Sequence, residues 1–439
     1  MHPANPLDAW IAARIGRPGS PLLRTDLLDY QLRKLRETVV WVKQCSPFYR
    51  RLLGGIDEAS LTALDDLRWL PLTTAGDLRR NDPPLLCVSQ SEISHVVTLE
   101  TSGTSGPPKR LFFTPEEQEA TLDFFDHGMR LPARGGDRVL IFFPGERPGS
   151  VGDLLTRALE RMGATAIPFG WPNDLAAAAE TLRREQPDVV VGAPVPMLAV
   201  ARYGAASSRQ PVRVRSVLLS ADHAAESLSQ SLARLWGCEV FEHYGMTEMG
   251  LGGGVDCPAH EGYHMRENEL LIEIIDPASG EPVALGETGE VVFTTLKRRG
   301  MPLVRYRTGD MSCLLTASCA CGSPLARLGR ITRRASCGIR LGEAGELTIG
   351  MLDEAIFVIE HVADFDAAFQ PGTSPMLKFN IRQSDRGVTE GYLAEVVSAA
   401  LKSIPVLDAA GLKSQVDVSL GDGILNRVGK RTITVETPN

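Results

Sequence analysis

Short apolar runs alternate with amphipathic stretches between about residues 135 and 245. Polar or turn residues bound each run, and the stretches between the runs repeat their apolar positions with helical spacing. The pattern predicts strands at 138–143, 164–169, 189–191, 216–219 and 239–243, and helices at 153–162, 174–186 and 224–236. Buried strands separated by helices are typical of a parallel sheet in an α/β domain.

Beyond residue 250, apolar and polar positions alternate and predict antiparallel strands at 270–276 and 290–295. After about residue 335, a smaller region combines predicted helices at 350–359 and 391–402 with predicted strands at 376–381 and 415–419. We therefore predict an α/β fold with two domains. The large N-terminal domain (1–332) has an N-terminal helical region, parallel α/β sheets and a β-rich part at about 250–332. The smaller C-terminal domain (333–439) is α+β.

Composition narrows the classes of protein to consider. The chain has 439 residues, of which 43% are hydrophobic and 23% charged, as is ordinary for a globular enzyme. Its net charge of −8 argues against a nucleic-acid partner. The longest apolar run, at 189–201, contains two prolines and is too short to cross a bilayer, and the N-terminus lacks a signal-peptide pattern. We expect a cytoplasmic protein that binds neither nucleic acid nor a membrane.

A loop rich in glycine and hydroxyl residues, at 101–109, carries the first candidate chemistry. Glycine lets the backbone approach a bulky anion, while backbone N–H groups, hydroxyls and a lysine can bind phosphate oxygens. Two prolines separate the last glycine from the lysine, and Arg110 follows, which disfavours a Walker A loop. A solvated linker is the alternative. The candidate residues are Thr101, Ser102, Gly103, Thr104, Ser105, Gly106 and Lys109.

Two further motifs follow the loop. Residues 244–248 read Tyr-Gly-Met-Thr-Glu, and residues 306–310 read Tyr-Arg-Thr-Gly-Asp. In this order the three motifs resemble the adenylate-forming, or AMP-binding, superfamily. Stretches at 46–51 and 300–310 look like its phenylacetate-CoA ligase-like branch, and the resemblance covers most of the chain through about residue 330.

The resemblance implies roles for these motifs. The loop at 101–109 would hold the β- and γ-phosphates of ATP, Thr247 would touch the α-phosphate, and Glu248 would help to hold Mg²⁺. Tyr244, followed by Gly245, would stack on the adenine, and Asp310 would bind the ribose hydroxyls. The other implied site residues are Ser220, Ala221 and Asp222 at the adenine, Arg330 in a Gly-Arg motif, and Lys430 at the acyl phosphate.

Each of these residues also has an ordinary structural interpretation. Tyr244 fits a core aromatic, and Glu248 fits a carboxylate that the dipole favours at the start of a helix. Asp310 fits a turn residue, and Arg330 and Lys430 fit solvated side chains.

Three cysteines and a histidine form a second group of candidates. Zinc prefers four soft or borderline ligands, which two short segments typically supply. Cys257 lies in one such segment, and Cys319 and Cys321 lie in another. Some members of the branch look similar here, and by that resemblance His264 is favoured over His260 as the fourth ligand. We expect a structural zinc ion at these four residues; four unrelated side chains are the alternative.

The chain departs from the family's pattern after Arg330. The family has an acidic hinge residue where this chain has Thr332, and the motif that should follow is absent. This difference puts the thioester-forming conformation in question and leaves adenylation unaffected.

The leading hypothesis is an enzyme that uses ATP and Mg²⁺ to convert a small carboxylic acid into an acyl-adenylate, and then transfers the acyl group to coenzyme A. A carrier-protein thiol, an amine or water is the alternative acceptor. A homologue that binds nucleotide without catalysis is a rival of another class, and the intact Lys109, Glu248 and Asp310 count against it. The sequence does not identify the acid, and only analogy with the branch suggests a homodimer.

Overall fold

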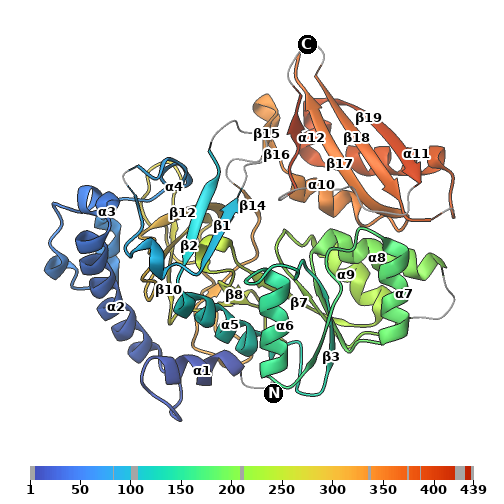
Figure 1. The fold of residues 1–439 in the computed structure, drawn as a ribbon. Helices are drawn as coiled ribbons and strands as arrows, with labels where there is room; N and C mark the ends of the chain where they lie inside the picture. The colour runs from blue at the N-terminus through green and yellow to red at the C-terminus, as the bar shows by residue number, and fades with distance from the viewer. Residues whose placement is uncertain are drawn as a thin grey trace. The chain divides into compact units, whose positions relative to one another are not determined.

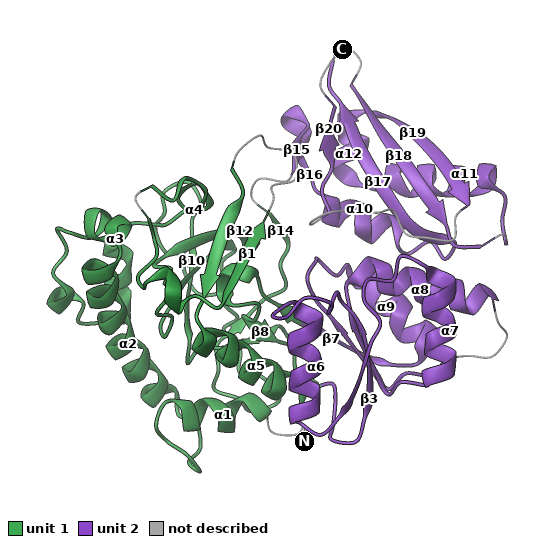
Figure 2. Ribbon diagram, viewed as in Figure 1, with its two compact units in different colours: residues 1–131, 243–335 green, residues 132–242, 336–439 purple. Residues whose placement is uncertain are grey.

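Two compact units divide the chain, and each is built from two separate segments (Figure 2). Unit 1 comprises residues 1–131 and 243–335, and unit 2 comprises residues 132–242 and 336–439. The chain passes from unit 1 to unit 2 after residue 335, close to the predicted domain boundary at residue 332. That boundary stays a prediction. The computed structural model describes residues 5–82, 84–99, 107–207, 212–334, 338–372, 375–385, 387–420 and 431–436.

Unit 2 contains the predicted parallel sheet, in the green part of the chain in Figure 1. The strand order is β4-β3-β5-β6-β7, and all neighbours are parallel. The strands are β3 (Arg138–Phe142), β4 (Thr165–Pro168), β5 (Val189–Gly192), β6 (Ser216–Leu219) and β7 (Glu239–Tyr244), whose last two residues belong to unit 1. The helices are α6 (Val151–Arg161), α7 (Leu175–Glu185), α8 (Pro194–Ser207) and α9 (Glu226–Trp236). Strands β5 and β6 are buried throughout, as expected for central parallel strands, so the prediction is confirmed.

The apolar run at 189–201 divides between two elements. Its first residues form β5, and α8 begins at Pro194. A proline in the first turn of a helix lacks only an N–H that has no intrahelical partner there, so it starts the helix instead of interrupting it. Within the described part of the chain, no helix is both long enough and apolar enough to cross a membrane.

The C-terminal part of unit 2 is the predicted α+β region. Its sheet has the order β19-β18-β17-β20, with β17 antiparallel to β18 and β18 parallel to β19. The elements are β15 (Ile339–Arg340), β16 (Glu346–Leu347), α10 (Ile349–Ile356), β17 (Val362–Gln370), β18 (Met376–Gln383), α11 (Glu390–Lys402), α12 (Pro405–Ala410), β19 (Lys413–Leu420) and β20 (Thr434–Val435). The sequence analysis does not predict β17, because Asp364 and Asp366 interrupt its apolar pattern.

Unit 1 joins an N-terminal helical region to antiparallel β structure. Its helices are α1 (Pro6–Arg14), α2 (Arg24–Cys45), α3 (Pro47–Leu52), α4 (Ala75–Arg80) and α5 (Pro115–Met129). One sheet has the order β10-β11-β12-β14, formed by β10 (Leu270–Ile275), β11 (Gly289–Thr295), β12 (Tyr306–Ser312) and β14 (Arg333–Arg334). The other strands are β1 (His95–Leu99), β2 (Lys109–Phe113), β8 (Gly254–Val255), β9 (Tyr263–Met265) and β13 (Arg327–Leu328). Antiparallel pairing in this region is confirmed, and apolar side chains of α2 and β11 share one core.

Candidate active site and metal centre

Lys109 and Glu248 lie together in unit 1, although 139 positions separate them in the sequence. Lys109 begins β2, and Glu248 lies in the 3-10 turn η4 (Thr247–Met249) that follows β7. The Nζ of Lys109 forms an ion pair with Oε1 of Glu248. The Glu248 side chain is only 3% exposed, and that of Lys109 is 17% exposed, so solvent screens the pair weakly. The structure thus joins the residues assigned by resemblance to phosphate and to Mg²⁺.

Two further side chains hold Glu248. The hydroxyl of Tyr306 donates to Oε1 over 3.3 Å, and Nη1 of Arg298 donates to the backbone carbonyl of Glu248 over 2.7 Å. The Arg298 guanidinium lies 4.3 Å from the ring centroid of Phe113 and is buried. Burial, and then the neighbouring Glu248 carboxylate, raises the pKa of Tyr306. The Tyr306 hydroxyl therefore stays a hydrogen-bond donor at neutral pH.

A second buried cluster joins Tyr244 to Asp310. The hydroxyl of Tyr244 donates to Oδ2 of Asp310 over 3.1 Å, and Nε of Arg334 donates to Oδ1 over 2.7 Å. Burial, and then the charge of Asp310, raises the pKa of Tyr244. An ionised carboxylate offers about four acceptor positions, so these two hydrogen bonds leave capacity for ribose hydroxyls.

Gly245 has a steric reason to be glycine. A Cβ at this position would lie 2.7 Å from both Cε1 of His243 and the carbonyl oxygen of Leu251, which is closer than side chains tolerate. The glycine thus allows a tight turn between β7 and η4. Thr247, which opens η4, is partly exposed, whereas Glu248 is buried.

Several predicted site residues are not part of these clusters. Arg330 is exposed in the segment between β13 and β14. Residues 101–106 and Lys430 lie outside the described part of the chain. Ser220, Ala221 and Asp222 belong to unit 2, where they directly follow β6.

Asp222 meets the C-terminal segment within unit 2. Its Oδ2 accepts a hydrogen bond from the backbone N–H of Arg431 over 3.4 Å, and Ala221 beside it has a left-handed φ of +74°. The side chain of Arg431 is buried, forms an ion pair with Asp353 and lies 4.4 Å from the ring centroid of Phe365. These contacts bring the residue after Lys430 to the predicted adenine-binding segment.

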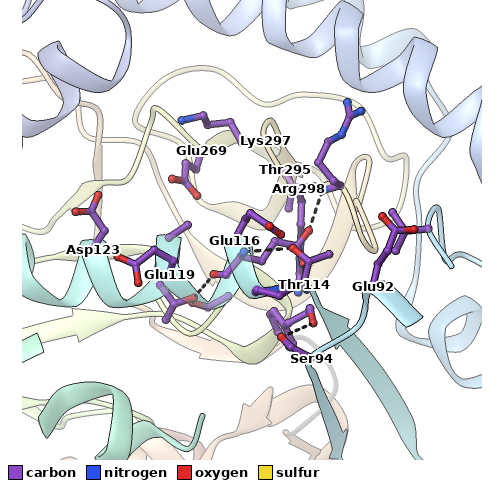
Figure 3. Close-up of a pocket in the computed structure, with 18 of the residues that line it drawn as sticks. Glu92, Ser94, Thr114, Glu116, Glu119, Asp123, Glu269, Thr295, Lys297 and Arg298 are labelled. Carbon is purple, nitrogen blue, oxygen red and sulfur yellow. Dashed lines mark hydrogen bonds and ion pairs between the residues drawn. The ribbon is translucent and has the colours of Figure 1, made fainter. Parts of the chain in front are cut away.

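A pocket of about 710 Å³ lies within unit 1 (Figure 3). Met249 and Gly250, the two residues after Glu248, help to line it. Its walls carry charges of both signs, and Figure 3 shows Lys297 next to Glu269. Arg298 lines the pocket and also holds the backbone of Glu248. The acidic lining residues are Glu92, Glu116, Glu117, Glu119, Asp123 and Glu269, and the basic ones are Arg14, Arg266, Lys297, Arg298 and Arg299.

Cys257, His264, Cys319 and Cys321 converge in unit 1. One ligand atom from each lies within 4.8 Å of the others. The Sγ atoms of Cys257 and Cys319 are 3.6 Å apart, and Sγ of Cys321 lies 3.4 Å from Nε2 of His264. Zinc bonds of about 2.3 Å to sulfur and about 2.0 Å to nitrogen place tetrahedral ligands about 3.5–3.8 Å apart, so the cluster fits zinc. His260 instead places Nδ1 2.6 Å from Oδ2 of Asp256.

Sequence reasoning missed three residues that contact the predicted site. Tyr306 opens a motif that the analysis recognised, so its membership of that motif was an available signal. Arg298 and Arg334 reach partners 50 and 24 positions away in the sequence. No local pattern marks such partners, because folding alone brings them together.

Comparison with known proteins identifies the family. Residues 29–296 match the family of AMP-binding enzymes. The chain is similar to a phenylacetate-coenzyme A ligase of Pseudomonas putida, with 30% identity over 317 residues, or 70% of each protein. A phenylacetate-coenzyme A ligase of Thermus thermophilus shows 30% identity over 325 residues, or 71% of each protein.

Comparison with solved structures gives the same fold. A crystal structure of 2-hydroxyisobutyryl-CoA ligase in the postadenylation state, in complex with 2-HIB-AMP, matches with a TM-score of 0.80 at 20% identity. The match covers 94% of this chain and 90% of that chain. The chain therefore belongs to the AMP-binding enzyme family, in its phenylacetate-CoA ligase-like branch.

Proposed function

We propose that this protein uses ATP to activate a small carboxylic acid as an acyl-adenylate and then transfers the acyl group to coenzyme A. Family membership supports the reaction type, and the relatives named above are phenylacetate-coenzyme A ligases. The convergence of Lys109 and Glu248 carries the proposal. It joins a cation suited to phosphate to a carboxylate suited to a metal ion.

The first step forms the acyl-adenylate. A carboxylate oxygen of the acid attacks the α-phosphorus of ATP, and the bond from that phosphorus to the pyrophosphate oxygen breaks. The step brings two anions together, so electrostatic stabilisation contributes most to catalysis. Lys109 and the loop at 101–106 bind the β- and γ-phosphates. The hydroxyl of Thr247 donates a hydrogen bond to the α-phosphate, and Lys430 binds the acyl phosphate. Glu248 would hold Mg²⁺, which would supply further positive charge at the phosphates when bound.

The nucleoside binds at the second buried cluster. Tyr244 stacks on the adenine, and Asp310 accepts hydrogen bonds from the ribose hydroxyls. Arg330 belongs to the same site in this proposal. Residues 220–222 border the adenine. The Tyr244–Asp310 hydrogen bond, at 3.1 Å, supports this arrangement because it fixes the ring and the carboxylate together.

The second step forms the thioester. The thiolate of coenzyme A attacks the acyl carbonyl, and AMP leaves. Thr332 favours a second candidate acceptor, a carrier-protein thiol or an amine, because the family's acidic hinge residue is missing there. Its N–H and hydroxyl both donate to the carbonyl of Met311, over 3.0 and 3.3 Å.

A structural zinc ion completes the proposal. Cys257, His264, Cys319 and Cys321 would hold it as a closed set of four ligands, with no position left for substrate. None of these four residues contacts Lys109, Glu248, Tyr244 or Asp310 in the hydrogen bonds of the described residues. The ion would therefore stabilise unit 1 without entering the reaction.

ATP–pyrophosphate exchange across aryl, arylacetic and short aliphatic acids tests this function. Exchange with one class of acid would establish adenylation and name the substrate class. Loss of the acyl-adenylate on adding coenzyme A, with a thioester formed, would establish the acceptor. Pyrophosphate exchange without thioester formation on adding coenzyme A would favour a carrier-protein thiol or an amine as the acceptor. Nucleotide binding without exchange for any acid would contradict the proposed reaction.

A further inference from the structure

The carboxylate of Glu248 has two side-chain donors among the residues that the structure describes. They are the ammonium of Lys109 and the hydroxyl of Tyr306, and both reach the same oxygen, Oε1. Within those residues, no donor reaches Oε2. Among the described residues, one oxygen is therefore held by two donors, and the other has lone pairs that a ligand could use.

The two donors differ in what nucleotide binding does to them. Under the proposed function, Lys109 turns to the phosphates of ATP and releases Glu248. Among the described residues, the Tyr306 hydroxyl, 3.3 Å from Oε1, is then the side-chain donor left to set the orientation of the carboxylate. We infer that Tyr306 is a positioning residue for Glu248, which holds the carboxylate in the orientation that binds Mg²⁺. This inference rests on the proposed function.

The backbone holds Tyr306 firmly enough for this role. Tyr306 opens β12 and pairs with Phe293 of β11, and the two rings meet edge to face with centroids 5.4 Å apart. Thr73 brackets the residue: its N–H donates to the carbonyl of Arg305, and its carbonyl accepts from the N–H of Arg307, each over 2.9 Å. Tyr306 is 1% exposed, so its ring is shielded from solvent.

Contacts of Arg305, immediately before Tyr306, show how firmly the conformation of this segment is fixed. It has a left-handed φ of +47°, which is uncommon for a residue with a side chain. Its buried guanidinium pairs with Glu273 at 3.0 Å and donates to the carbonyl of Leu70 over 2.7 Å. A strained backbone persists only where its surroundings over-determine it, and such places gather at functional sites.

The test is a titration of nucleotide binding with Mg²⁺. A fluorescent ATP analogue reports binding to the full-length wild type and to Tyr306→Phe, which keeps the ring and removes the hydroxyl. Loss of an outer partner of a metal ligand typically weakens the metal site by 10- to 100-fold. We expect Tyr306→Phe to need at least about tenfold more Mg²⁺ for half of the gain in affinity, with unchanged affinity in the absence of Mg²⁺.

Tyr30→Phe is the matched control. It also removes a buried hydroxyl, one that donates to the carbonyl of Asn268 over 3.0 Å, and we expect it to leave the Mg²⁺ midpoint unchanged. Equal midpoints for Tyr306→Phe and the wild type would overturn the inference, even if the variant melts at a lower temperature. A nucleotide affinity of the wild type that does not depend on Mg²⁺ would also overturn the inference. Pyrophosphate exchange by the wild type separately decides whether the proposed function itself fails.

Discussion

Lys109 and Glu248 form an ion pair that links the first residue of β2 to the turn after β7. The pair has a physical reason, because a buried carboxylate without a partner is costly. In the proposed reaction, the lysine would neutralise Glu248 until phosphate and metal replace the pair. The same two residues therefore stabilise unit 1 and prepare the proposed nucleotide site.

Replacement of Lys109 tests the phosphate side of this relationship. Lys109→Met removes a charge-assisted contact to phosphate, worth about 1.5–3 kcal/mol, so we expect kcat/KM for ATP to fall roughly 10- to 100-fold. Lys297→Met is the control, since it deletes the same charge from the nearby pocket. Steady-state rates at several ATP concentrations give kcat/KM for both variants. Equal values for Lys109→Met and Lys297→Met would contradict the phosphate role.

Asp310 should confer selectivity for the ribose. A site built to accept hydroxyl donors rejects nucleotides that lack them, because its buried acceptors are left unpaired. We expect the wild type to prefer ATP over 2′,3′-dideoxy-ATP, and Asp310→Asn to lose most of that preference. Competition binding of the two nucleotides measures it, with Asp276→Asn, a partly exposed residue directly after β10, as the control. An Asp310→Asn variant that keeps the full preference would place the ribose elsewhere.

The sequence predicts the architecture well where local patterns determine it. The buried strands β5 and β6 and helix α11 follow directly from apolar runs and helical spacing. Helix α8 is missed because its prolines look like breaks, although Pro194 stands where a helix tolerates proline. For the candidate site, motif order points to Lys109, Glu248, Tyr244 and Asp310, which the structure joins in two pairs and whose roles stay predictions. The residues that hold them, such as Arg298 and Arg334, come from distant segments and leave no periodic trace.

The cysteine and histidine cluster should carry zinc. We expect about one zinc ion per chain by elemental analysis of the purified protein. Cys319→Ser should lose the ion and lower the Tm by at least about 5 °C, because metal binding contributes directly to folding. Cys45→Ser, outside the cluster, should keep the ion. A metal-free wild type with the same Tm after addition of zinc would count against the site.

Acid should destabilise the protein through His243. Burial lowers the pKa of His243 to about 4, well below the value of about 6.5 in an unfolded chain. The unfolded state therefore binds more protons between these values. The contribution of neutral His243 to the free energy of unfolding is fully present above about pH 6.5. It is lost as the pH falls towards 4, by up to about 1.4 kcal/mol per pH unit.

Unfolding by denaturant at several pH values between 4.5 and 7.5 measures this effect. The free energy of unfolding of His243→Gln should fall less steeply with acid than that of the wild type. Parallel curves for the two proteins would show that His243 titrates normally in the folded state.

The most direct test of the central claim is ATP–pyrophosphate exchange by the wild type and Glu248→Gln, each with the acid that gives the highest activity. Glutamine keeps the size of the side chain but removes the charge that binds Mg²⁺, so we expect exchange to fall by at least about a hundredfold. The protein should remain folded, with ATP still bound weakly. Exchange at the wild-type rate in Glu248→Gln, or none with any acid in the wild type, would contradict the account.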